Sequence, residues 1–234
     1  MDRPRSLRHT DRTAEFELVD SASPHLEAIV SHVEKHIGKP ATVLHELVSD
    51  LIHVDIHVVA PTSKRNYYTL VTSGMSDRPM NVPAGFEEWR FAEVMICLPS
   101  DWPMEQAKWK DQRNYWPIWL LKTLARFPHE YSTWLGPGHT VPNGDPPTPY
   151  VANTKLCCAF LLPPALERRE FWKLAVDSQT TINFFGVYPL YLEELRLNLK
   201  HGMGPLCNRF DKHAVSLVLD VNRTNVCRKR FGLF

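Results

Sequence analysis

Apolar residues follow two different periods along this chain of 234 residues. Spacing by three and four residues, which places apolar side chains on one face of a helix, predicts helices over 24–37, 117–128 and 189–201 and a short helix from 205. The first helix begins at Ser23-Pro24, because serine is a favoured N-cap and proline fits the first helical position. Prolines open the second and third helices as well.

Runs rich in β-branched and aromatic residues predict the strands. The predicted strands are 42–48, 52–60, 67–72, 91–98, 155–162, 181–187 and 215–219. A Ser49-Asp50 turn would join the first two as a hairpin. Strands and helices alternate in clusters, so the predicted fold class is α/β of the mixed α+β kind, a mixed β-sheet flanked by helices. We expect a mobile lead-in over 1–15 and a single domain over 16–234.

Charge and cysteine content narrow the expected partners and compartment. The formal net charge is +1, which gives no long-range field for nucleic acid or an acidic membrane. The five cysteines are odd in number and contain no C-x-x-C pair, which argues against a disulfide framework and for a reducing compartment. Residues 1–15 carry charges throughout and no apolar run approaches ~18 residues, so we expect a cytoplasmic chain without a signal peptide or membrane span.

The predicted strand 52–60 carries a metal-ligand pattern. His53, Asp55 and His57 alternate, so they share one face of the strand, and two imidazoles with a carboxylate are a metal-ligand set. His45 joins this face only if the hairpin loop includes Leu51, and a two-residue turn points it away. The competing interpretation is a half-exposed strand, in which His and Asp alternate with aliphatic residues. Ligands two apart on one strand also lie roughly 7 Å apart at Cα, which is wide for three ligands of one ion. We therefore predict no metal and no cofactor, with a metal-dependent hydrolase as the alternative.

The stretch 71–80 predicts a sharp turn after a strand. Gly74 can adopt positive φ without steric cost, and nearby hydroxyl and carboxylate groups can bond backbone amides. Two methionines, Met75 and Met80, are interpreted as exposed and adaptable contacts. A turn that satisfies its own polar groups is the alternative interpretation. The candidate binding residues in this stretch are Ser73, Met75, Ser76, Asp77 and Arg78.

A second candidate stretch, 134–147, is rich in proline and glycine and lacks periodicity. Long irregular loops inside compact domains are uncommon and usually functional when ordered. His139 and Asp145 resemble a base and its orienting group, but no nucleophile accompanies them. Its candidate binding residues are Trp134, Gly138, His139, Thr140 and Asn143.

Several of these stretches together resemble the suppressor of fused family. They are 53–58 (HVDIHV), 68–80 (YTLVTSGMSDRPM), 92–99 (AEVMICLP), 115–118 (YWPI), 138–143 (GHTVPN) and 188–195 (YPLYLEEL). They occur in family order over roughly residues 25–200. The resemblance implies a mixed α/β sandwich and no enzymatic activity. The animal member clamps a short peptide of Hedgehog-pathway transcription factors between two domains, and this chain resembles the first of them.

The function expected from these observations is a non-enzymatic module that binds another, unidentified protein, and neither nucleic acid nor a membrane. The contact surface would combine the two candidate stretches, which must then meet in space. The departures from the animal proteins resemble bacterial members, for which an immunity or regulatory role is implied. A structural or homo-oligomeric module stands as a third alternative.

Overall fold

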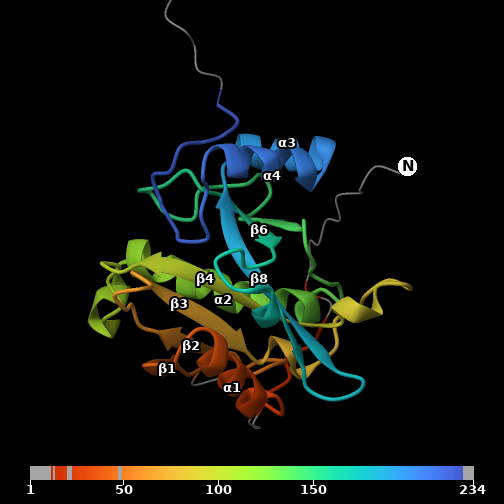
Figure 1. Cartoon of the computed structure of the whole chain (residues 1–234). Coiled ribbons are helices and arrows are strands. Elements are labelled where there is room, and N and C mark those ends of the chain that lie inside the picture. The colour runs from red at the N-terminus through yellow and green to blue at the C-terminus, as the bar shows by residue number, and fades with distance from the viewer. Residues whose placement is uncertain (1–11, 13, 20–22, 47–48, 229–234) are drawn as a thin grey trace, which may run out of the picture.

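One eight-stranded mixed sheet carries the fold in the computed structural model, which describes residues 12, 14–19, 23–46 and 49–228 (Figure 1). The strand order is β1-β2-β3-β4-β8-β6-β5, with β7 also paired to β8. The strands are β1 (Thr42–Leu44), β2 (Asp55–Val59), β3 (Tyr67–Ser73), β4 (Phe91–Pro99), β5 (Thr140–Pro142), β6 (Cys158–Leu162), β7 (Lys173–Ala175) and β8 (Thr181–Leu190).

Neighbouring strands run antiparallel except at the centre of the sheet. Strands β1 to β4 form a meander, and β4 then pairs in parallel with β8, where Phe91 lies opposite Ile182. Strands β5, β6 and β7 complete the sheet on the other side of this parallel pair. The middle strands β4 and β8 are almost fully buried, as expected for strands covered on both faces.

Helices cover both faces of the sheet. The α-helices are α1 (Leu26–His36), α2 (Gln112–Glu130), α3 (Leu192–His201) and α4 (Met203–Lys212), and the 3-10 helices are η1 (Met75–Asp77), η2 (Glu87–Trp89), η3 (Gln106–Lys110) and η4 (Arg169–Phe171). Helix α2 packs its apolar side on the face that carries Ile56 and Val94. Helices α1, α3 and α4 pack on the opposite face, where α1 lies against β3, and α3 and α4 lie near the end of β8 (Figure 1).

The predicted fold class is confirmed, but several boundaries are wrong. Helix α2 begins at Gln112, because the carboxylate of Asp111 accepts a hydrogen bond from the Arg113 amide and caps the helix before Pro117. Pro189 lies in β8 and does not open a helix. The predicted strand 215–219 is reduced to one bridge, between Cys97 and Val218.

Two predictions concern the chain outside this core. The lead-in predicted over 1–15 falls mostly on residues 1–11 and 13, which lie outside the described residues. Residues 14–19 run beside the loop that follows β1, and Leu18 forms a bridge with Asp50. Among the described residues, none of the helices has the length and apolar character needed to cross a bilayer.

Candidate functional site

The loop between β1 and β2 is longer than the predicted two-residue turn. Strand β1 ends at Leu44 and β2 begins at Asp55, with Leu44 paired to Ile56. Continuing this register places His45 opposite Asp55, which is the arrangement expected when Leu51 belongs to the loop. Leu51 adopts a positive φ of 65°, a conformation that bends the chain sharply and is uncommon for leucine.

Two histidines converge on one carboxylate at the start of β2. His45 Nδ1 lies 3.1 Å and His53 Nε2 lies 3.0 Å from the same Asp55 Oδ1. His57 shares the strand face but is buried, and its Nε2 lies 2.8 Å from Ser73 Oγ. Burial lowers the pKa of His57 and favours the neutral ring. The predicted set of His53, Asp55 and His57 is therefore wrong in one member, since His45 takes the place of His57.

A second carboxylate, that of Glu93 on β4, is fully enclosed. Its Oε1 accepts hydrogen bonds from the Ser76 amide at 2.9 Å and the Ser76 hydroxyl at 2.6 Å, and its Oε2 accepts one from the Thr72 hydroxyl at 2.6 Å. Burial raises the pKa of Glu93 to about 7, against the lowering effect of these hydrogen bonds. This network fixes the turn that follows β3 to the centre of the sheet.

Three of the predicted binding residues therefore lie in the interior. Ser73, Met75 and Ser76 are buried, and so is Met80. The prediction that the two methionines form an exposed contact surface is wrong, because both side chains fill the core beneath α2. The Ser73 hydroxyl instead contacts His57, and the Ser76 hydroxyl donates to Glu93. Both serines therefore hold the segment in place through buried hydrogen bonds.

Gly74 makes the tight approach of this segment to β2 feasible. Its φ is 108°, and a Cβ at this position would lie 1.8 Å from the carbonyl oxygen of His53. Only glycine adopts this conformation without a clash. The turn after β3 and the start of β2 are therefore in direct backbone contact.

Asp77 and Arg78, the other two predicted binding residues of this stretch, are half-buried. Asp77 Oδ1 accepts a hydrogen bond from Ser23 Oγ at 2.5 Å, and burial raises the pKa of Asp77. The guanidinium of Arg78 donates to both carboxylate oxygens of Glu17, at 2.9 and 2.7 Å. Arg78 thereby joins the segment 14–19 to the turn after β3.

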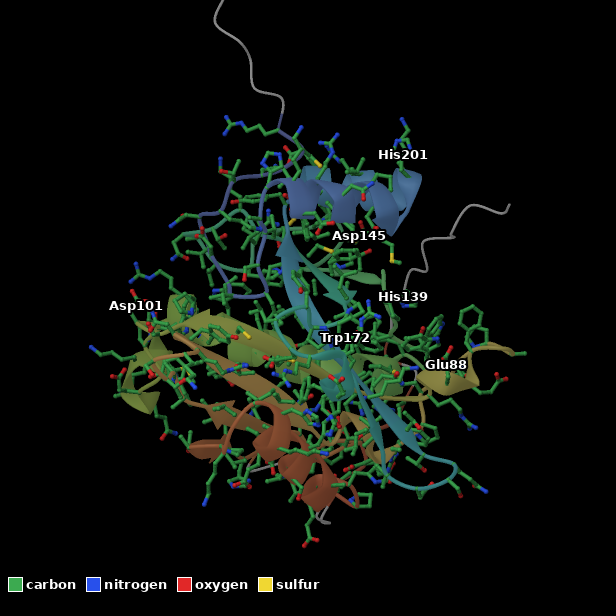
Figure 2. All side chains as sticks on the ribbon, in the orientation of Figure 1. Glu88, Asp101, His139, Asp145, Trp172 and His201 are labelled. Atoms are coloured by element: carbon green, nitrogen blue, oxygen red, sulfur yellow. The ribbon has the colours of Figure 1, made fainter. Side chains whose placement is uncertain are left out.

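The second candidate stretch is more regular than predicted. Thr140 begins β5, which pairs with β6. The Trp134 ring packs against His139 at 4.3 Å between ring centroids, and burial lowers the pKa of His139. Figure 2 shows His139 and Asp145 below the helices α3 and α4 in this view. Asn143 donates to the carbonyls of Thr148 and Pro149, so its side chain closes its own loop.

Gly138 of the same stretch contacts the helices. Its carbonyl accepts a hydrogen bond from Asn198 on α3 at 3.2 Å, and its amide donates to Leu161 at 2.7 Å. An added Cβ at Gly138 would lie 2.9 Å from the sulfur of Met203. This end of the stretch is therefore fastened to α3, α4 and β6.

The two candidate stretches meet at their other ends. The Asn81 amide donates to the Thr133 carbonyl at 3.0 Å, its side chain donates to Ser132 at 2.9 Å, and the Leu135 amide contacts Met80 Sδ at 3.4 Å. Beside this junction lies an open groove of about 750 Å³, here named the Arg78 groove. Its lining residues are Ala14, Glu15, Phe16, Glu17, Leu51, Arg78, Pro79, Asn81, Pro128, His129 and Ser132.

Three residues of these sites were not anticipated from the sequence. Glu93 stands alone in an otherwise apolar strand, and a lone carboxylate in a buried strand is the signal that could have identified it. His129, whose Nε2 contacts the Met75 carbonyl at 2.9 Å, lies beyond the predicted helix end. Glu17 follows the predicted lead-in, and no sequence feature indicates its pairing with Arg78.

Comparisons with known proteins agree on one family. The family model of the suppressor of fused protein (SUFU) matches residues 50–224. No curated protein shows significant sequence similarity to the chain. Among solved structures, a suppressor of fused homologue from Neisseria gonorrhoeae aligns with a TM-score of 0.62 and 17% identity, over 87% of this chain and 97% of that one.

Two further structures show the same fold. The Sufu–Fu complex aligns with a TM-score of 0.60 and 15% identity, over 88% of this chain and 93% of that one. Drosophila Suppressor of Fused aligns with a TM-score of 0.57 and 15% identity, over 90% of this chain but 53% of that one. The resemblance to this family and the mixed α/β architecture are both confirmed.

Proposed function

Because the chain belongs to the suppressor of fused family, we propose that it is a protein-binding module that recognises a segment of another protein in the Arg78 groove. The observation that carries this proposal is the groove itself, which is lined by Arg78 and Pro79 of the first candidate stretch and by no residue of the second, 134–147. The Sufu–Fu complex supports it at the level of the fold, since that structure holds a protein partner. The proposed action is non-enzymatic and cytoplasmic.

The wall of the groove supports an extended polypeptide as the ligand. The Leu51 amide donates to the Glu17 carbonyl at 2.9 Å, and the Val19 amide donates to the Ser49 carbonyl at 3.3 Å. This loop therefore already pairs with an extended segment through backbone hydrogen bonds, the mode by which many domains bind peptides. Phe16 and Leu18 beside it are 66% and 64% exposed, and exposed apolar side chains at a groove are typical of partner contacts.

The polar groups of the groove favour a ligand of mixed character. Arg78, Glu17 and Glu15 bring both signs of charge to the lining, and Asn81 adds an amide. The Arg78 side chain is 41% exposed although it pairs with Glu17, so it retains surface for a partner carboxylate or carbonyl. A volume of about 750 Å³ suits a few side chains of a peptide rather than a whole domain.

Charge reversal at Arg78 tests the proposal. The Arg78→Glu chain should recover at least about 10-fold less of a stoichiometric protein partner from a lysate of the native host than the wild type does. Arg113→Glu is the matched control, because Arg113 also makes an exposed bidentate pair, with Asp111. It lies at the far end of α2, about 24 Å along the helix axis from His129.

The same two variants also show which result would contradict the proposal. Circular dichroism and thermal melting should first show that both variants are folded. Equal partner recovery by wild type, Arg78→Glu and Arg113→Glu would contradict a role for the Arg78 groove. A loss with both variants would place recognition elsewhere or indicate a purely ionic contact.

A finer proposal is an immunity or regulatory role in a bacterium, in which the bound protein is a toxin or regulator that the module inhibits. The suppressor of fused homologue from Neisseria gonorrhoeae supports a bacterial setting for the fold. A gene for a secreted toxin beside this one, and neutralisation of that toxin by the purified chain, would support this version. Failure of neutralisation would remove it and leave the groove proposal standing.

A further inference from the structure

We propose that His45, His53 and Asp55 form a binding site for a single divalent transition-metal ion, with Zn²⁺ as the best-fitting ion. One ligand atom from each residue lies within 4.8 Å of the other two. The two imidazole nitrogens stand 3.1 and 3.0 Å from Asp55 Oδ1. Ligands of one tetrahedral zinc ion are about 3.3 Å apart, given bonds of about 2.0–2.1 Å. Only small side-chain movements are therefore needed for all three atoms to reach one ion.

The backbone holds the three ligands in place. Asp55 is the first residue of β2, and His53 precedes it by two positions on the same face. The β1–β2 register brings His45 opposite Asp55. The loop between them is tied to α2 through Glu46, which pairs with Lys122 and Arg126 and accepts a hydrogen bond from the Val54 amide.

A second layer of contacts orients His53. Ser49 Oγ lies 2.6 Å from His53 Nδ1, so Nε2 faces Asp55. In the metal-free protein Nε2–H donates to Asp55 and the Ser49 hydroxyl donates to Nδ1. When Nε2 binds a metal, the ring proton moves to Nδ1. The Nδ1–H group then donates a hydrogen bond to Ser49 Oγ, because a hydroxyl oxygen can also accept a hydrogen bond. The same pair of contacts thus serves both states, as partners of metal-bound histidines commonly do.

Exposure and chemistry favour zinc among the divalent ions. The side chains of His45, His53 and Asp55 are 65%, 25% and 7% exposed, so an ion can enter from the His45 side while the carboxylate anchors it below. Imidazole nitrogens select zinc and related ions over Mg²⁺ and Ca²⁺, which prefer oxygen ligands. Three protein ligands also leave a fourth position for water or for a side chain of another molecule.

Titration of Zn²⁺ into the tag-free, chelator-treated chain tests the site, in competition with a colorimetric zinc chelator. We expect one ion per chain, and at least a 10-fold weaker affinity for His45→Ala and for Asp55→Asn. His45 is exposed, so its variant should fold normally. The matched control is His213→Ala, which removes an exposed histidine at the end of α4 and should bind within 2-fold of the wild type. Co²⁺ should give a visible absorption band with the wild type that His45→Ala abolishes.

Two results would overturn the site. One is a wild-type chain that binds no Zn²⁺ at micromolar concentrations. The other is an affinity that His45→Ala leaves unchanged, or that His213→Ala lowers equally, which would indicate scattered surface histidines. Because both readouts use the metal alone, their outcome is independent of the partner recovered through the Arg78 groove.

Discussion

Two carboxylates, Glu93 and Asp55, occupy the same half of the sheet and have opposite surroundings. Glu93 is completely buried and is bound by two hydroxyls and a backbone amide. Asp55 is nearly as buried, but its partners are two imidazoles, one of which is largely exposed. The first network is closed to solvent and the second opens to it.

The difference teaches that the partners of a buried carboxylate decide what it can do. The hydroxyl and amide groups that donate to Glu93 are short and belong to the core, so no group from solvent replaces them. Glu93 therefore serves to fix the turn after β3. Imidazoles are longer, can bind either a proton or a metal, and reach from Asp55 to the surface. Gly74 lies between the two networks, touching the His53 carbonyl on one side and preceding η1 on the other.

The largest effect is expected where the two networks touch. Replacing Gly74 by alanine should lower the free energy of unfolding by more than about 3 kcal/mol or prevent folding, because the new Cβ would meet the His53 carbonyl at 1.8 Å and because φ is positive. Urea denaturation measures the change. Gly85→Ala is the control, since Gly85 also has a positive φ, of 86°, but open space around it, and it should cost only about 1–2 kcal/mol. Equal losses would show that the clash is absorbed.

An intermediate effect is expected from neutralising the closed network. The folded-state pKa of Glu93 is about 7 against 4.5 for the ordinary group. Its contribution to stability is therefore complete below about pH 4.5 and is lost as the pH rises through 7. Glu93→Gln avoids this loss, and its side-chain amide can donate to Thr72 Oγ1, whose hydroxyl turns to the Val94 carbonyl.

The measurement is urea denaturation of wild type and Glu93→Gln across this pH range. The difference in unfolding free energy should move in favour of Glu93→Gln by on the order of 2 kcal/mol between pH 4.5 and pH 8. Glu88→Gln, which alters an exposed carboxylate, is the matched control. A constant difference for Glu93→Gln would contradict the raised pKa.

The smallest effect is expected from replacing Asp55, whose network opens to solvent, in the metal-free chain. Asp55→Asn keeps an oxygen that both imidazoles can use as an acceptor, so the metal-free chain should lose about 1 kcal/mol or less. The same urea denaturation at neutral pH in the presence of a chelator measures it. A loss of more than about 3 kcal/mol would mean that Asp55 is a structural carboxylate comparable with Glu93, and the contrast between the two networks would fail.

Local patterns predicted the faces of the strands well. The alternation in 52–58 correctly placed Ile56 and Val58 on the opposite face from Asp55 and His57. The interpretation as a half-exposed strand is wrong, because both faces of β2 are buried. The position of His45 could not be predicted, since it depends on one residue of loop length and on the left-handed Leu51. The role of Glu93 could not be predicted from its own apolar strand, because its partners Thr72 and Ser76 come from another strand and the turn that follows it.

Long-range contacts account for most of what the sequence did not reveal. The Arg78 groove depends on Arg78 pairing with Glu17 and on Asn81 bonding to Ser132 and Thr133. These pairs are separated by about fifty residues or more, and no spacing rule connects them. Met80 and Leu135 bring the edges of the two candidate stretches into contact, but of the predicted binding residues Arg78 alone lines the groove. The shared binding surface therefore stays a prediction.

The parallel pairing of β4 with β8 has a consequence for how the chain folds. It joins Phe91 to Ile182, 91 positions apart, and contacts of such sequence separation slow folding through loop-closure entropy. During synthesis the β1–β4 meander can form early, but the outer edge of β4 has no neighbour until β8 leaves the ribosome. Until then that apolar edge is a template for unwanted association, so the nascent chain should depend on chaperones most strongly before β8 emerges.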